Sequence, residues 1–364
     1  MNKLYIGLMS GTSADGIDAA LVDFSDTHPQ LLATHYTKFT PEIRRYILDL
    51  CQPGDNEINR LGELDAELGK EFAITANTLL KQNQLNKEQV CAIGSHGQTI
   101  RHHPKRNFTL QIGDPNIIAS ETGITTVADF RRRDIALGGQ GAPLVPAFHA
   151  AIFRSPTVNR IVVNIGGMAN ITLLPADDSQ PIHGFDTGPG NTLLDAWIEK
   201  HLHEPRDTDG NWARQGQIDN DLLQALLKDP FFSLKAPKST GREYFNLEWL
   251  EKQLPTSIKP IDVQATLVEL TAQSIIAAIK QYCSSGEIIL CGGGAHNTFL
   301  MEQLRKAGSH YSIESTQKFG ISPDWIEAMA FAWLAKQTLA KQSGNIKTVT
   351  GAKEASILGG VYFV

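Results

Sequence analysis

The chain has 364 residues, 41% of them hydrophobic, and a formal net charge of −6, because 39 Asp and Glu outnumber 33 Lys and Arg. This length suggests two domains or one large one, and the hydrophobic content allows a full core and excludes a disordered chain. The negative charge argues against nucleic acid or a membrane surface as a partner. No apolar run reaches the roughly 18 residues of a membrane-spanning helix.

The first two predicted strands, Leu4–Met9 and Ile17–Phe24, flank a turn of small residues, hydroxyls and carboxylates. The turn and the start of the second strand read Gly11-Thr12-Ser13-Ala14-Asp15-Gly16-Ile17-Asp18. Backbone N–H groups and hydroxyls in such a turn can bind phosphate. The carboxylates of Asp15 and Asp18 would then need a divalent cation between them and the phosphate. An ordinary polar turn is the alternative.

Strands and helices alternate through the rest of the first half, which indicates an α/β fold. The predicted strands are Leu31–Phe39, Val90–Ser95, Phe108–Ile112 and Thr125–Phe130, and the predicted helices are Pro41–Leu50, Ile58–Gln82, Asn116–Glu121 and Val145–Phe153. A polar turn at His96–Thr99 follows a buried strand. His102 and His103 are predicted to lie in a loop, because no third metal ligand stands at a suitable spacing.

The pattern restarts near residues 155–157. A strand at Arg160–Ile165, a turn at Gly166–Asn170 and a returning strand at Ile171–Leu174 repeat the opening arrangement. We interpret this as an ancient duplication, with two unrelated hairpins as the alternative. The predicted domains are residues 1–153 and 154–364.

A third glycine turn, Gly292–Asn297, follows a predicted strand at Glu287–Cys291. Between the second and third glycine turns, Asp186 lies in a segment rich in Gly and Pro that is predicted to be a turn. The main helices predicted in this half are Thr192–His203 with Asn191 as its N-cap, Val263–Cys283, the helix from Asn297 to Lys306, and Asp324–Leu339. The sequence contains no G-x-x-x-x-G-K-[ST] motif, and no G-x-G-x-x-G follows a strand. Three separate glycine turns could instead hold a triphosphate together.

The four cysteines form no C-x-x-C pair and are expected to be buried reduced thiols of a cytosolic protein. The chain begins directly with a strand, so we expect no signal peptide.

Motifs along essentially the whole chain resemble anhydro-N-acetylmuramic acid kinase. The segments that carry this resemblance are Gly11–Asp18, Ala128–Arg131, Gly138–Pro146, Asn164–Asn170, Phe185–Asn191, Gly241–Asn246 and Cys291–Asn297. Family members also have Met at the position of Ala14. The family belongs to the sugar kinase, actin and heat-shock ATPase superfamily. The resemblance therefore implies two duplicated actin-like α/β domains, with mixed central sheets flanked by helices and a nucleotide cleft between them, in a cytoplasmic homodimer.

The resemblance also implies a reaction of bacterial cell-wall (peptidoglycan) recycling, in which 1,6-anhydro-N-acetylmuramic acid, ATP and water give N-acetylmuramic acid 6-phosphate and ADP. O6 of this sugar is an ether to C1 and carries no proton. A carboxylate should therefore activate water to attack C1, and the departing O6 should take the γ-phosphoryl group. The alternatives are a plain hydroxyl sugar kinase and an ATPase of the same superfamily that couples ATP to conformation.

Matching the family motif makes Asp186 the expected base, with capping of the following helix as its alternative role. Glu327 lies among core residues of a helix and either faces solvent or is a second catalytic carboxylate, which the resemblance favours. Arg131 is expected to bind the lactyl carboxylate of the sugar. His96 and Gln98 are expected to hydrogen-bond the sugar, and a neutral structural role is the alternative for His96.

The remaining expected site residues bind ATP and Mg²⁺. The nucleotide set is Gly11, Thr12, Ser13, Ala14, Asp15, Gly16, Ile17, Asp18, Gly166, Gly167, Gly292, Gly293, Gly294, His296 and Asn297. Within this set, Asp15 and Asp18 are the expected metal ligands, directly or through water.

Overall fold

The computed structural model describes residues 3–26 and 28–364. The first of its two compact units contains the described residues up to Ile152 together with Trp325–Val364, and the second is Phe153–Asp324. The predicted domains, 1–153 and 154–364, differ from this division in the segment 325–364, because a helix in that segment packs on the sheet of the first unit. No helix in the described ranges is long and apolar enough to cross a membrane.

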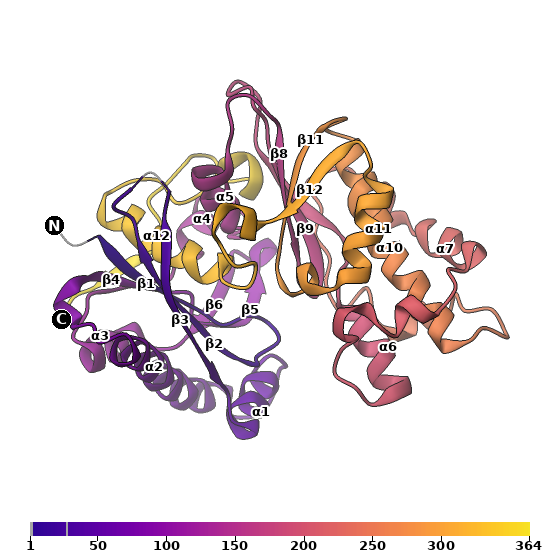
Figure 1. Ribbon diagram of the computed structural model, residues 1–364. Coiled ribbons are helices and arrows are strands. Elements are labelled where there is room, and N and C mark those ends of the chain that lie inside the picture. Colours follow the sequence, from indigo (N-terminus) through magenta and orange to yellow (C-terminus); the bar gives the residue numbers. More distant parts are fainter. Residues whose placement is uncertain (1–2, 27) are drawn as a thin grey trace. The chain divides into compact units, whose positions relative to one another are not determined.

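The first unit is built on a six-stranded mixed sheet with the order β13-β7-β4-β1-β2-β3 (Figure 1). Its strands are β1 (Leu4–Met9), β2 (Gly16–Asp23), β3 (Gln30–Lys38), β4 (Val90–Ser95), β7 (Thr126–Ala128) and β13 (Gly360–Tyr362). Strands β1, β2 and β3 pair antiparallel, whereas β1, β4 and β7 run parallel. A separate hairpin joins β5 (Gln98–His103) to β6 (Phe108–Ile112). The prediction that His102 and His103 lie in a loop is wrong, because both residues pair with β6.

Helices cover both faces of the first sheet. The helices of this unit are α1 (Pro41–Leu50), α2 (Glu57–Gln82), α3 (Pro115–Thr122), α4 (Arg132–Ala136), α5 (Val145–Phe153), α12 (Ile326–Leu339) and α13 (Lys347–Thr350), and α2 and α12 pack on the sheet. Ile6 and Leu8 of β1 share a core with Phe72 of α2. Because successive side chains of a strand point to opposite faces, Gly7 faces the other way. A Cβ there would lie 1.8 Å from the carbonyl oxygen of Ala328 in α12. Helices α2 and α12 therefore lie on opposite faces (Figure 1).

The second unit repeats the topology of the first. Its strands are β8 (Arg160–Ile165), β9 (Met168–Leu174), β10 (His183–Pro189), β11 (Gly286–Cys291) and β12 (Tyr311–Ser315). Their order is β10-β9-β8-β11-β12, with β8, β9 and β10 antiparallel and β8, β11 and β12 parallel. The run β3-β2-β1-β4-β7 has the same order and the same directions. The predicted duplicated mixed α/β architecture is thereby confirmed.

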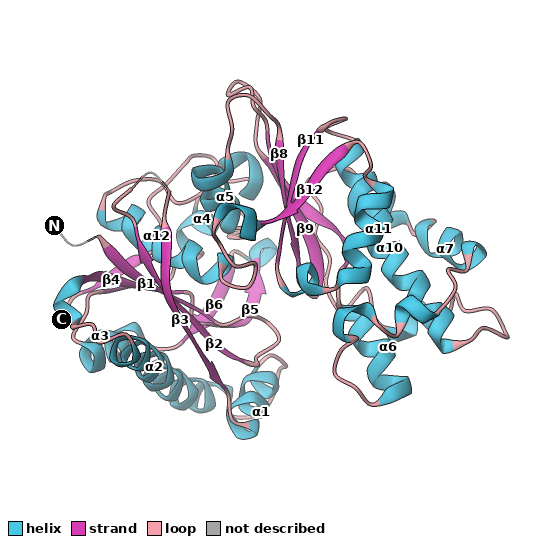
Figure 2. Ribbon diagram, viewed as in Figure 1, coloured by secondary structure: helices cyan, strands magenta, loops and turns pink. Residues whose placement is uncertain are grey.

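Helix α10 forms the centre of the second core. The helices of this unit, drawn in cyan in Figure 2, are α6 (Thr192–Leu202), α7 (Asn220–Leu227), α8 (Pro230–Ser233), α9 (Leu247–Glu251), α10 (Pro260–Lys280) and α11 (Thr298–Ala307). Buried residues of α6, α7, α10 and α11 form one cluster with the inward side chains of the sheet.

Two local predictions in this unit are wrong. The predicted turn Gly166–Asn170 is shorter, because β9 already begins at Met168. Asp186 lies within β10 and not in a turn, because its segment pairs with β9 despite its Gly and Pro content, with a shift of register after Asp186. Asn191 does precede α6 as predicted, but its side chain donates to the carbonyl oxygen of Ile165 instead of capping the helix. All four cysteines carry thiols, but the prediction that they are buried is wrong for three of them, because only Cys291 is buried and Cys51, Cys91 and Cys283 are half-buried.

Candidate active site

Three residues meet at the carboxyl ends of parallel strands in the first unit. Ser10 follows β1, His96 follows β4, and Arg131 lies beyond the end of β7. Nδ1 of His96 lies 3.2 Å from the carbonyl oxygen of Ser10, and Nε2 lies 3.1 and 2.8 Å from Nε and Nη2 of Arg131. Because arginine only donates, Nε2 accepts and the ring is neutral with its proton on Nδ1. This edge of a sheet is where α/β folds commonly place ligands.

The surroundings of His96 favour the structural alternative for this residue. Its side chain is 5% exposed, and both ring nitrogens are bonded. Burial, followed by the charge of Arg131, lowers the pKa of His96 to about 3. The neutral ring therefore links Arg131 to the opening turn. Gln98 bonds the same turn, with Oε1 2.7 Å from Oγ of Ser10 and Nε2 donating to the carbonyl oxygen of Gly11 at 3.2 Å.

Arg131 retains donors for an anion. Its Nη1 donates to the carbonyl oxygen of Gly141 at 2.8 Å, in addition to the two contacts with His96. A guanidinium has five N–H groups. Three of them are bonded to His96 and Gly141, so one N–H on each terminal nitrogen remains. Burial lowers the pKa of Arg131 to about 10, so the group is cationic at neutral pH.

Glu327 lies in the first turn of α12 and is half-buried. Burial raises the pKa of its carboxyl group, and the positive charge of Arg131 opposes that rise. Within the described ranges its carboxylate makes no hydrogen bond or ion pair. The first unit thus brings an uncommitted carboxylate within the electrostatic reach of a cation that has spare donors.

Asp134 fixes the loop that holds Arg131. It is completely buried and accepts from the backbone N–H of Gly141 at 2.7 Å, and from the side chains of Asn345 at 2.6 Å and Thr350 at 2.7 Å. Each bond to a buried charged group is worth about 1.5–3 kcal/mol. Because the N–H of Gly141 donates to Asp134 and its carbonyl oxygen accepts from Arg131, the backbone of this residue ties the two side chains together.

The opening turn has the exposed polar groups that phosphate binding requires. Thr12 is exposed, and Ala14 adopts a positive φ of 53° while its N–H donates to the carbonyl oxygen of Gly11. The Asp15 carboxylate is 3.4 Å from Nε of Arg44. Burial raises the pKa of Tyr36, and the charges of Asp15 and Asp18 raise it further, so both carboxylates act on one hydroxyl. No cluster of three potential metal ligands occurs among the described residues.

A Mg²⁺ ion is compatible with this pair. Mg²⁺ commonly takes only one or two carboxylates and completes its shell with water and substrate phosphates. Two carboxylates near the hydroxyl of Tyr36 fit that requirement, provided that Arg44 releases Asp15.

The second unit brings the other two glycine turns to one edge of its sheet. Gly166 and Gly167 follow β8, and their carbonyl oxygens accept from the N–H groups of residues 190–192 at 2.8–3.1 Å. Gly292 follows β11 with φ +80°, and a Cβ there would lie 2.3 Å from Oδ1 of Asn164. A Cβ on Gly294 would lie 2.3 Å from Cγ2 of Ile165. Glycine is therefore required where these loops touch.

Two further predicted site residues, His296 and Asn297, lie at the end of the third turn. Asn297 caps α11, accepting from the N–H of Leu300 at 3.0 Å, so its side chain is committed to the helix. His296 is exposed and lies 2.8 Å from the carboxylate of Asp324.

Asp186 lies on β10, opposite Asn170 of β9. Its Oδ2 accepts from the N–H of Thr240 at 2.9 Å, and its own N–H donates to the carbonyl oxygen of Lys238 at 3.1 Å. Burial raises the pKa of Asp186 to about 6, Thr240 and Lys238 oppose the rise, and Glu243 adds to it. A carboxylate with this pKa can accept a proton near neutral pH.

Sequence reasoning missed the segment that holds Asp186. Lys238 and Thr240 precede the quoted motif Gly241–Asn246, and no role was expected for them. The Oγ1 of Thr240 is buried and has no hydrogen-bond partner in the described chain. Arg242 was missed as well. A Cβ on Gly167 would lie 3.6 Å from its Nη2, so its guanidinium is close to the second glycine turn. The only signal in the sequence is the family motif Gly241–Asn246, which contains Arg242 and directly follows Thr240.

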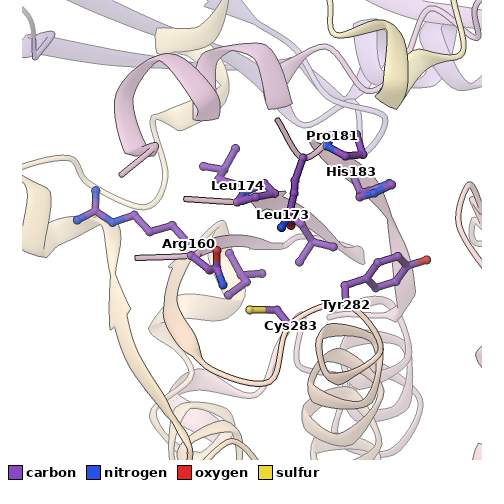
Figure 3. A pocket seen from close by; sticks show the side chains of 11 residues that line it. Arg160, Leu173, Leu174, Pro181, His183, Tyr282 and Cys283 are labelled. Carbon is purple, nitrogen blue, oxygen red and sulfur yellow. The ribbon is translucent and has the colours of Figure 1, made fainter. Parts of the chain in front are cut away.

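A pocket of about 200 Å³ lies elsewhere in the second unit, and Figure 3 shows it. Arg160, Leu174, His183, Tyr282 and Cys283 contribute to its lining. Arg160 begins β8 and Leu174 ends β9, so the pocket is at the end of the sheet opposite the turn at Gly166. None of the predicted site residues within the described ranges lines it.

A model of the family described as anhydro-N-acetylmuramic acid kinase matches residues 3–364. Proteins of this description are 53% identical over 368 residues in Saccharophagus degradans and 52% identical over 365 residues in Shewanella pealeana, covering 99% of both chains each time. Among solved structures, component A of the (R)-2-hydroxyglutaryl-CoA dehydratase of Acidaminococcus fermentans is 12% identical, with a TM-score of 0.48 over 93% of this chain and 99% of its own.

Proposed function

Since the chain belongs to the anhydro-N-acetylmuramic acid kinase family, we propose that it couples hydrolytic opening of 1,6-anhydro-N-acetylmuramic acid to phosphorylation of O6 by ATP. The product is N-acetylmuramic acid 6-phosphate, a sugar of peptidoglycan recycling. The observation that carries this mechanism is the environment of Asp186, a carboxylate fixed by a backbone N–H and with a pKa raised to about 6.

In the proposed reaction, Asp186 removes a proton from water while the water oxygen bonds to C1. The C1–O6 bond breaks, and its electron pair passes to O6. O6 then bonds to the γ-phosphorus, and the bond from that phosphorus to the β,γ-bridging oxygen breaks to release ADP. The phosphoryl group thus takes the place of the proton that a general acid delivers in an inverting glycosidase.

The other residues bind and orient the substrates. Arg131 binds the lactyl carboxylate through its two remaining N–H groups, and Glu327 orients the attacking water or the sugar. The glycine turns at residues 11–16, 166–167 and 292–294 receive the phosphates through backbone N–H groups. Asp15 and Asp18 would hold Mg²⁺, which neutralises developing negative charge on the phosphates when bound.

Isotope incorporation tests the coupled mechanism. The enzyme is mixed with anhydro-sugar and Mg-ATP in ¹⁸O-labelled water, and the product is reduced at once with borohydride, before its anomeric oxygen exchanges. We expect one ¹⁸O at C1 and none in the phosphate. A plain hydroxyl kinase would give a phosphorylated sugar without ¹⁸O at C1, and a conformational ATPase would release ADP with no sugar product.

The same assay tests the two carboxylates. Asp186→Asn should lower kcat by about 10²- to 10⁴-fold, the usual contribution of a general base, and Glu327→Gln should also lower kcat. Asp221→Asn, at an exposed position of α7, is the matched control and should leave kcat unchanged. Unaltered turnover in Asp186→Asn would show that Asp186 is not the general base. Unaltered turnover in Glu327→Gln would show that Glu327 does not orient the attacking water or the sugar.

The family resemblance also supports a cytoplasmic homodimer. Light scattering of the purified protein would give twice the chain mass of 39.9 kDa if it is a dimer, and the monomer mass would contradict it.

A further inference from the structure

The segment 238–240 pairs with β10, an outermost strand of the second sheet, at Asp186. Strand β10 lies at the edge of this sheet, and an edge strand leaves backbone groups unpaired. Here the N–H of Asp186 donates to the carbonyl oxygen of Lys238 at 3.1 Å, and the N–H of Thr240 donates to Oδ2 of Asp186 at 2.9 Å. Lys238 therefore binds the backbone of Asp186, and Thr240 binds its side chain.

The Lys238 side chain is buried, which is unusual for lysine. It is 9% exposed, its Nζ donates to the carbonyl oxygen of Phe231 at 3.1 Å, and Nζ lies 4.5 Å from the centre of the Phe231 ring. No carboxylate of the described chain lies within ion-pair distance of Nζ. A buried ammonium is unfavourable unless nearby negative charge or dipoles compensate for lost hydration.

The charge that acts on Lys238 is that of Asp186. Burial lowers the pKa of Lys238, and the Asp186 carboxylate opposes that change. The relation is mutual, because Lys238 lowers the pKa of Asp186 while burial raises it. Glu243 is the other charged side chain that influences Asp186, and it raises the pKa of Asp186. Glu243 is exposed and lies, like Lys238, in the loop of residues 234–246 between α8 and α9.

We propose that Lys238 is a positioning residue for the catalytic base, Asp186. The ammonium group of Lys238, held against Phe231, supplies the buried positive charge that keeps Asp186 in its carboxylate form. The backbone N–H of Thr240 fixes one oxygen of that carboxylate. This inference rests on the proposed role of Asp186. It assigns a catalytic purpose to a buried lysine that does not touch the reacting atoms. Glu243 acts in the opposite direction from the surface.

The pH dependence of kcat tests this assignment. At saturating ATP and sugar, the acid limb reports the base in the enzyme–substrate complex. Without a nearby positive charge, Asp186 should bind its proton more tightly, so Lys238→Met should move the limb up by about one pH unit. With the pKa of Asp186 at about 6 in the unaltered enzyme, a shift of one unit means about a fivefold loss of kcat at pH 6 and almost no loss at pH 8. Lys238→Arg should leave the limb in place.

Glu243→Gln should move the same limb to lower pH, because it removes a negative charge that disfavours the carboxylate. Opposite shifts in two variants of one segment are not expected from general damage to the fold. Lys235→Met, at an exposed position of the loop 234–246, is the control and should leave the acid limb of the kcat profile in place. Should Lys238→Met fail to fold, Lys238→Gln, which retains a donor toward Phe231, replaces it. An unmoved limb in a folded neutral variant, or shifts of the same sign in both variants, would overturn the proposal.

Direct titration separates this inference from the proposed function. Carboxyl resonances of ¹³C-labelled aspartate give the pKa of Asp186 without turnover, with Asp186→Asn identifying the signal. We expect this pKa to rise in Lys238→Met and to fall in Glu243→Gln. If Asp186→Asn remains active, the proposed function fails whatever the titration shows. If Asp186→Asn is inactive but Lys238→Met leaves the titration unchanged, only the role of Lys238 fails.

Discussion

At the scale of single residues, Arg131 offers a test of substrate recognition. Three of its N–H groups are bonded within the protein, and two remain for a carboxylate. Hydrogen bonds between charged groups contribute about 1.5–3 kcal/mol each. Because Arg131→Ala removes two such bonds, we predict that it raises KM for the natural anhydro-sugar by about 100-fold or more, and raises KM far less for an anhydro-sugar without the lactyl group. Steady-state kinetics with both sugars give the ratio.

Two further variants make this test specific. Arg131→Lys retains the charge but not the paired N–H groups, so it should restore only part of the discrimination. Arg132→Ala is the control, because Arg132 is exposed and pairs with Asp129. Equal increases in KM for both sugars would mean that Arg131 only supports His96 and the loop at Gly141.

The positions of glycines that adopt a special backbone conformation could be predicted from the sequence, whereas the burial of a charged side chain could not. Gly292 was expected in a tight turn, and it has φ +80° with a side chain of Asn164 against it. Lys238 was not expected to matter, because a lysine in a polar loop usually points to solvent. Its burial depends on Phe231, which the loop reaches only in the folded chain. The sequence allows two roles for His96, and its bonded ring nitrogens favour the structural one.

At the scale of elements, close packing of α12 on the first sheet gives a stability prediction. A Cβ at Gly94 of β4 would lie 2.0 Å from the carbonyl oxygen of Phe331 in α12. Backbone cannot move away as a side chain can, so Gly94→Ala should cost about 3 kcal/mol or more of unfolding free energy, at the upper end of overpacking effects. Urea unfolding monitored by circular dichroism measures the change. Activity should fall too, because α12 carries Glu327.

The matched control is Gly62→Ala in α2. Gly62 is exposed in a helix interior, and a Cβ there would meet no atom within 4 Å. Alanine is the better helix former, so this variant should gain about 1 kcal/mol. Equal effects of the two substitutions would contradict the packing of α12 against β4.

Strands with regular apolar patterns could be predicted closely, and strands defined by pairing could not. The boundaries of β1, β4 and β8 match their predictions. In β10, Gly184, Gly188 and Pro189 are typical of a turn, and only pairing with β9 makes the segment a strand. Strand β5 was missed for the same reason, since its polar residues gain their structure from β6.

At the scale of the whole molecule, the sequence indicated a duplication, and the matching strand orders of the two sheets confirm it. It could not assign α12 to a sheet, because an apolar helix can cover either one. The glycines that receive α12, Gly7 and Gly94, lie far from it in the chain. The contact therefore depends on tertiary packing.

Titratable groups are divided unequally between the two units, which predicts different responses to acid. Burial lowers the pKa of His96 and His149 to about 3, and both lie in the first unit. These histidines bind protons below about pH 6.5 only when unfolded, so the first unit should lose about 1.4 kcal/mol per histidine per pH unit below that value. In the second unit, the pKa values of Asp186 and Asp195 are raised to about 6. Their contribution to stability therefore increases as pH falls from about 6 toward 4.

Hydrogen exchange read by mass spectrometry at pH 7.5 and 5.5, corrected for intrinsic rates, distinguishes the two units. Peptides of the first unit should lose protection at pH 5.5, while peptides of the second unit should retain it. His149→Gln removes a buried titrating ring to which no catalytic or binding role is assigned, and should make the loss in the first unit smaller. His310→Gln, at an exposed position, should change neither response. Equal loss in both units, or a loss unaffected by His149→Gln, would show that these buried rings do not determine the acid sensitivity.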